Sequence, residues 1–288
     1  MTALLALGAA VFYGSADFFG GLTARRANTI ATVFVSQFAG LVLLLVVLPF
    51  LPAATISSRD WLWGIVAGLS GGIGVALLYR ALAIGTMAVV APITAVCAAM
   101  IPVLFAFGMG ERLRPLTILG IALAFVAIVL VSQPRASSEA EGGPPGASRF
   151  FPPGVLLALL AGVIVGLFFL SLARTTSGAG MWPLIAARVT SIALFGLIAI
   201  MSGRSLRMNA SATTTAVVGG ALDMLANALY MLAARVGPLS IVVTLASLYP
   251  AGTVILARLV LGERLSFVQT LGIVCALAAV VVIVGTSA

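Results

Sequence analysis

The sequence contains ten apolar runs, each long enough to cross a lipid bilayer as a helix. A spanning helix needs about 20 mostly apolar residues, whereas the strands of a membrane β-barrel alternate in polarity over about 10 residues. These runs are long and unbroken, so we predict an all-α integral membrane protein with ten transmembrane helices, surrounded by membrane lipids. The runs lie at about residues 3–23, 30–50, 61–83, 87–107, 115–133, 153–174, 182–202, 213–235, 238–260 and 267–286.

The composition excludes several classes of protein. Of the 288 residues, 62% are hydrophobic and 8% are charged, whereas a soluble domain has about 25% charged residues. There is no His, and Cys97 and Cys275 lie far apart, so we expect no zinc site, which would need clustered His or Cys. We find no GxxxxGK[ST] nucleotide-binding motif and no basic run with interleaved aromatic residues. We therefore expect no cofactor and no nucleic-acid partner, and the net charge of +8 favours contact with anionic lipid headgroups.

An internal repeat relates the two halves of the chain. The segment GERLRPLTILGI at residues 110–121 matches GERLSFVQTLGI at 262–273 at seven of twelve positions, with an offset of 152 residues. Gly14 and Gly166 match at the same offset. A chance match of this density at one offset is improbable, so we interpret the chain as two homologous units.

The repeat predicts the domain organisation. We expect a first five-helix repeat at residues 1–133, a flexible linker rich in Gly, Pro and Ser at 134–151, and a second five-helix repeat at 152–288. Because five is odd, the second repeat enters the membrane from the opposite face. Such inverted repeats are the architecture of many secondary transporters, whose substrate site lies near the midplane between the repeats.

Polar side chains inside the apolar runs mark a candidate substrate site. A charge at the bilayer centre costs at least about 2.5–3.5 kcal/mol, so we expect these side chains to face the bundle interior or a wet cavity. Asp223, Asn227 and Tyr230 have the spacing i, i+4, i+7, which places them on one face of a helix. In the alternative interpretation, Asp223 or Asp17 pairs with Arg188 or with a helix end and only locks the bundle. The candidate substrate-binding residues are Tyr13, Asp17, Tyr79, Arg188, Asp223, Asn227, Tyr230, Thr244 and Ser247.

Two prolines are candidate gating residues. Pro92 and Pro250 fall inside the predicted fourth and ninth helices. Proline removes a backbone hydrogen bond and can kink a helix, so these residues would let the two helices bend during transport. The alternative is a static kink at each position.

Two further patterns are interpreted as structural. Gly64, Gly68 and Gly72 recur at every fourth residue of the third run, a spacing that lets helices approach closely. Glu111 and Glu263 belong to the two GERL segments. We expect each carboxylate to pair with the adjacent turn or to accept hydrogen bonds from amides at the start of the next helix.

These motifs resemble the EamA type of the drug/metabolite transporter superfamily. The shared features are GERL after the fourth helix of each half, RDW before the third helix, and Tyr79 and Tyr230 near the ends of the third and eighth helices. Pro250 also fits, whereas Ala98 stands at the equivalent position of the first half. The resemblance implies ten helices, cytoplasmic termini and export of metabolites. Family members of this length are similar to broad-specificity amino-acid exporters, including those for aromatic amino acids, of the bacterial inner membrane.

We therefore expect a secondary transporter that exports amino acids by alternating access, works as a monomer and is not an enzyme. Asp223 or Asp17 would meet the substrate ammonium, and Arg188 would meet the carboxylate. The alternative is an exporter of lipophilic cations or drugs, which an intramembrane Asp also suits. A membrane enzyme would need an acid–base pair or a metal site, and a scaffold would not need polar inward faces. Uniport and proton exchange both stay open.

The distribution of arginine favours the opposite orientation. With cytoplasmic termini, nine arginines fall in outer loops and five in cytoplasmic loops, against the positive-inside rule. Arginines buried at helix ends would weaken this count. The resemblance is the reason for expecting cytoplasmic termini.

Overall fold

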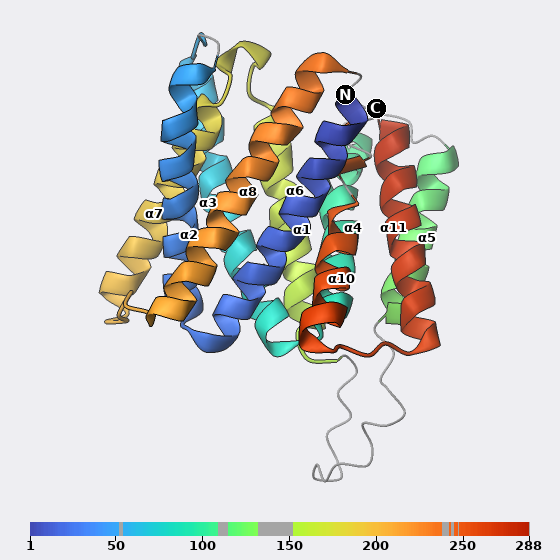
Figure 1. Ribbon diagram of the computed structural model, residues 1–288. Helices are drawn as coiled ribbons and strands as arrows, with labels where there is room; N and C mark the ends of the chain where they lie inside the picture. Colours follow the sequence, from blue (N-terminus) through green and yellow to red (C-terminus); the bar gives the residue numbers. More distant parts are fainter. Residues whose placement is uncertain are drawn as a thin grey trace.

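The computed structural model describes residues 1–51, 54–108, 115–131, 152–237, 242, 245–246 and 248–287, which hold ten α-helices, two short 3-10 helices and no β-strand (Figure 1). The 3-10 helices are η1 (Leu48–Phe50) and η3 (Ser177–Ala179). The α-helices are α1 (Thr2–Arg26), α2 (Thr29–Val47), α3 (Ser58–Ile84), α4 (Met87–Gly108), α5 (Pro115–Val131), α6 (Val155–Ala173), α7 (Trp182–Met201), α8 (Ala210–Val236), α10 (Tyr249–Leu261) and α11 (Phe267–Ser287).

Each of the ten predicted runs overlaps one of these α-helices, so the all-helical membrane fold is confirmed. Seven helices in the described part of the chain are long and apolar enough to cross a membrane. The apolar stretches of α4, α5 and α10 are shorter. The ninth run differs most from its prediction, because α10 begins only at Tyr249, with Val242 and residues 245–246 also helical before it.

Pro250 lies at the start of a helix rather than in the interior of the longer ninth helix that was predicted. It occupies the first turn of α10, where the missing amide hydrogen costs nothing because the first amides of a helix have no partner within the helix. Pro92 and Pro102 do lie inside α4. An interior-proline kink is therefore available to α4, whereas Pro250 stands where α10 begins, and a role of either proline in gating stays a prediction.

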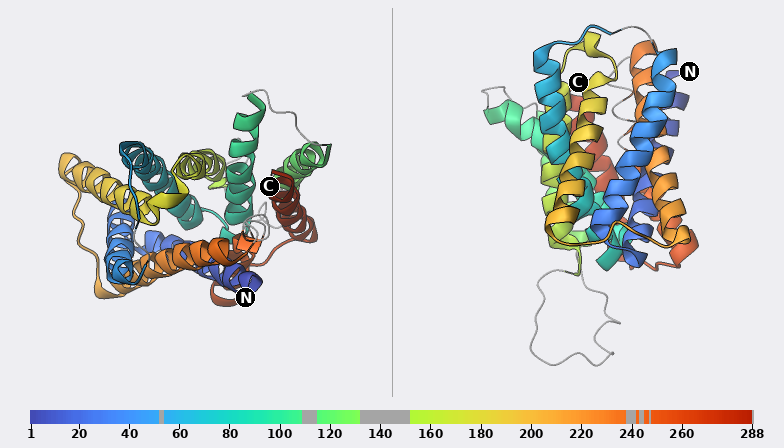
Figure 2. Two further views of the ribbon diagram at one scale, coloured as in Figure 1. Left: turned by 90° about the horizontal axis from the view of Figure 1, so that it is seen from above. Right: turned by 90° about the vertical axis from the view of Figure 1, so that its left-hand side faces the viewer.

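The repeat governs how the helices pack. Helix α8 is α3 shifted by 152 residues at both ends. Helices α6, α7 and α8 of the second half are the equivalents of α1, α2 and α3 of the first. Contacts between the halves are equivalent too: α1 packs on α8 as α6 packs on α3, and α2 packs on α8 as α7 packs on α3. In Figure 1, α1 runs downward from the end marked N whereas α6 runs upward. Figure 2 shows α5 and α11 side by side at one end of the bundle and α7 at the other.

Matching glycines make these helix contacts close. A Cβ atom on Gly14 would lie 2.3 Å from the carbonyl oxygen of Tyr249 in α10, and one on Gly166 would lie 2.5 Å from Ile101 in α4. Likewise, a Cβ on Gly68 would lie 2.5 Å from a carbonyl of α7, and one on Gly220 would lie 2.1 Å from a carbonyl of α2. The packing interpretation of the glycines is confirmed, and it holds at equivalent positions of both halves.

One buried carboxylate ties the start of α3 to the loop after α6. Asp60 is fully buried and completes a capping box with Ser57, whose hydroxyl donates to it at 2.6 Å. Asp60 also accepts a 2.7 Å hydrogen bond from the backbone amide of Thr176 and a 3.0 Å bond from its hydroxyl. The carboxylate therefore joins the two halves at the face where α3 begins.

We expect Asp60→Ala to lower the free energy of unfolding by about 2 kcal/mol, the upper end for loss of a helix cap, because Thr176 loses its acceptor as well. Thermal unfolding in detergent would measure this loss. Arg59→Ala, at the exposed neighbouring position, is the matched control. A midpoint equal to that of the control would show that Asp60 does not hold the loop.

Candidate functional site

A charged pair lies inside the bundle, between α7 and α8. One guanidinium nitrogen of Arg188 donates to the carboxylate of Asp223, and the other terminal nitrogen donates to the side-chain oxygen of Gln37 in α2. The Arg188 side chain is 12% exposed and that of Asp223 is 29% exposed. The two charges are therefore compensated by each other, and part of each side chain remains exposed.

Asn227 extends this group along α8 as the helical spacing predicts. Its side-chain nitrogen donates to the backbone oxygen of Asp223 at 2.7 Å and approaches the carboxylate at 3.4 Å. Asp223 and Asn227 thus share one face of α8. We call Gln37, Arg188, Asp223 and Asn227 the polar cluster.

Helix α1 brings a tyrosine and a second carboxylate near the polar cluster. Tyr13 and Asp17 both interact electrostatically with Asp223. The ring of Tyr13 stands edge-on to that of Tyr249 in α10, with centroids 6.3 Å apart. Asp17 has no ion-pair or hydrogen-bond partner among the described residues. Aromatic rings and a carboxyl group without a polar partner among the described residues therefore border the pair.

The other two predicted tyrosines are packed more tightly. Tyr79 is only 4% exposed, and a Cβ on Gly20 would lie 2.1 Å from its ring, so the ring lies flush against α1. Tyr230 packs against Ala6 and Ala233, beyond Asn227 on α8. Both side chains therefore pack between helices near the polar cluster.

The other predicted residues, and one residue that was not predicted, complete the comparison with the sequence. Thr244 and Ser247, predicted for the ninth run, lie outside the described residues. Gln37 was missed, although an amide in the middle of the second apolar run was a usable signal. Among the described residues, no three His, Cys, Asp or Glu side chains are grouped as metal ligands.

The polar cluster does not follow the repeat. At the offset of 152 residues, Arg188 corresponds to Ser36, and Asp223 corresponds to Gly71. Gln37 corresponds to Val189. The glycine contacts are duplicated while the charged groups are present once, so the Arg188–Asp223 pair is specific to the second half, and the first half adds Gln37.

Comparison with known proteins identifies the family. The model of the EamA-like transporter family matches residues 1–133 and 152–285, most of both halves. This chain belongs to the EamA-like transporter family. The EamA-like chain is therefore a multi-pass membrane transporter, and the polar cluster lies within its transporting fold.

Solved structures agree with the fold. A crystal structure described only as that of a protein is 18% identical to this EamA-like transporter, with a TM-score of 0.60. The match covers 98% of this chain and 95% of that one. At this identity it shows a shared fold and nothing about the substrate. No curated protein matches the sequence.

Proposed function

We propose that this EamA-like transporter exports amino acids, with broad specificity, across the bacterial inner membrane by alternating access. The observation that carries the proposal is the Arg188–Asp223 pair, which is partly exposed in the interior of the bundle. A buried pair costs desolvation energy and often stabilises a fold no better than apolar residues would. A function for the two charges is therefore the simpler explanation of their presence.

A zwitterion suits this pair chemically. The carboxylate of an amino acid can take the place of Asp223 on the guanidinium, which binds carboxylates through two parallel hydrogen bonds. The ammonium can take the place of Arg188 beside Asp223. Exchange of partners keeps both buried charges compensated, so binding avoids the cost of an isolated charge. Tyr13 and Tyr249 would contact the substrate side chain without selecting one shape.

A lipophilic cation is the second candidate substrate. The carboxyl groups of Asp17 and Asp223 interact electrostatically, and of the two only Asp223 forms an ion pair among the described residues. An organic cation that pairs with Asp17 would favour the ionised form of this carboxyl group. Competition between the two kinds of solute distinguishes the candidates.

We expect purified transporter in proteoliposomes to take up labelled amino acids several-fold faster than protein-free vesicles. Unlabelled amino acids should compete with this uptake, because they exchange with both members of the pair, and organic cations should compete weakly. Uptake would be measured across a panel of amino acids, with and without an imposed pH gradient, to separate uniport from proton exchange. Uptake equal to that of protein-free vesicles for the whole panel would overturn the proposal. Competition by organic cations alone would favour the second candidate.

We further propose cytoplasmic termini, as the resemblance implies, and a monomer as the working unit. The structure supplies one reason to discount the arginine count. Arg25, counted among the outer-loop arginines, binds helix carbonyls and a carboxylate. Its charge is therefore held at helix ends and does not act as a free loop charge.

A further inference from the structure

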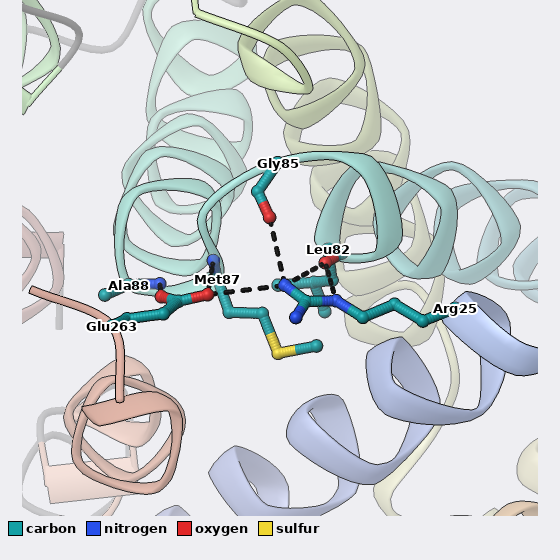
Figure 3. A network of polar contacts seen from close by, with 6 residues as sticks. All are labelled: Arg25, Leu82, Gly85, Met87, Ala88 and Glu263. Carbon is teal, nitrogen blue, oxygen red and sulfur yellow. Dashed lines mark hydrogen bonds and ion pairs between the residues drawn. The ribbon is translucent and has the colours of Figure 1, made fainter. Parts of the chain in front are cut away.

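A second polar network, separate from the polar cluster, joins Arg25, Glu263 and the backbone at the ends of α3 and α4 (Figure 3). Glu263, in the connection between α10 and α11, accepts hydrogen bonds of 2.9 Å from the backbone amides of Met87 and Ala88. These are the first residues of α4. Glu263 does accept from helix-start amides as predicted, but the helix is α4 of the other half rather than the adjacent α11.

Arg25 completes the network from the end of α1. Its guanidinium lies 3.3 Å from the carboxylate of Glu263 and donates to the carbonyls of Leu82 and Gly85, at 3.3 Å and 3.2 Å. These carbonyls end α3. A cation thus meets the negative end of α3, and an anion meets the positive end of α4.

We propose that Arg25 and Glu263 form a gate latch, which holds this face of the transporter closed and must open for solute to pass. Glu263 comes from the second half, whereas α1, α3 and α4 belong to the first. The latch therefore joins the two halves at one face. Alternating access requires the halves to separate at each face in turn.

The surroundings allow the latch to open and close. The side chains of Arg25 and Glu263 are 28% and 11% exposed, and a cavity of about 320 Å³ adjoins them, lined also by Thr86 and Gln269. Water in this cavity can hydrate both charges once the contacts break. Behind the latch, Met87 is fully buried, and its terminal methyl would lie 3.0 Å from a Cβ on Gly21 of α1. If α4 moved away from Glu263, the Met87 side chain would move with it.

Labelling of a central cysteine from each face tests the latch. Cys97 and Cys275 are replaced by alanine, and Tyr13→Cys provides a reporter beside the polar cluster. A membrane-impermeant maleimide is applied to either side of oriented vesicles. In a parallel variant, Arg264→Cys marks the latch face, because Arg264 is exposed next to Glu263.

With the latch intact, we expect the reporter to be labelled chiefly from the opposite face. In Glu263→Gln, labelling from the latch face should rise several-fold and labelling from the opposite face should fall. Arg25→Gln should act in the same direction but more weakly, because Glu263 still caps α4, and it serves as the test if Glu263→Gln fails to fold. Arg26→Gln, exposed at the same helix end, should have no effect.

Equal increases in labelling from both faces would show that the latch only stabilises the fold, and would overturn the proposal. Unchanged labelling from both faces would also overturn it. So would a reporter that is labelled chiefly from the latch face while the latch is intact. The assay contains no substrate. Its outcome is therefore independent of which solute the transporter carries and of whether the amino-acid proposal is right.

Discussion

Replacing Arg188 with alanine is expected to abolish transport and to lower the free energy of unfolding by about 3–5 kcal/mol, the cost of leaving one partner of a buried ion pair uncompensated. Asp223 would keep only the weak contact with Asn227, and Gln37 would lose its guanidinium donor. Uptake in proteoliposomes and thermal unfolding in detergent would measure the two effects. Arg204→Ala, at an exposed position, is the matched control.

A double variant separates binding from locking. In Arg188→Met with Asp223→Leu, two apolar side chains replace the pair, a change that is often neutral or stabilising. We expect unfolding near that of the unmodified protein but no transport, because neither substrate charge has a partner. Transport that survives in a stable double variant would show that the pair only locks the bundle, the alternative that the sequence left open.

Alanine at Gly220 is expected to cause the largest loss of stability among substitutions in the helix contacts. Its Cβ would lie 2.1 Å from the carbonyl oxygen of Ser36 and 2.8 Å from the Cα. Backbone atoms cannot turn aside as a side chain can, so α2 and α8 must separate. We expect a loss at or above about 3 kcal/mol, the upper end for overpacking, seen as a lower unfolding midpoint and poor yield from membranes.

Gly196→Ala provides the matched control. It lies in α7, and its Cβ would meet Phe34 at 3.4 Å, an ordinary contact with a side chain. Alanine should be neutral or stabilising there, since it is the better helix former. Similar losses for the two variants would show that close approach of α2 and α8 at Gly220 is not the cause of the effect.

The fold could be predicted from the sequence because two strong constraints act locally. Lipid requires each spanning segment to be long and apolar, and the repeat of GERL and glycine fixes the offset between the halves. The start of the ninth helix was harder to predict. Hydrophobicity continues through residues 238–260, so apolar content does not show that α10 starts at Tyr249, and the available local signal was Pro250, a residue favoured in the first turn of a helix.

The candidate site was only partly predictable. Asp223 and Asn227 follow from helical spacing, since both lie on α8. Arg188 pairs with Asp223, and Glu263 accepts from the first amides of α4. Both contacts join residues far apart in the chain, which the helical spacing of polar residues does not predict. The sequence could therefore name the polar groups of the interior but could not choose between a free and a paired Asp223.

The unequal polar content of the halves has a consequence for how such a protein can be built. A symmetric dimer of the first half would contain Asp17 and Gln37 but no arginine at the interior position, where Ser36 stands instead. A dimer of the second half would have Arg188 and Asp223 but no Gln37. A dimer of the second half would therefore hold the Arg188–Asp223 pair twice, whereas this carrier holds the pair once, with Gln37 from the first half beside it.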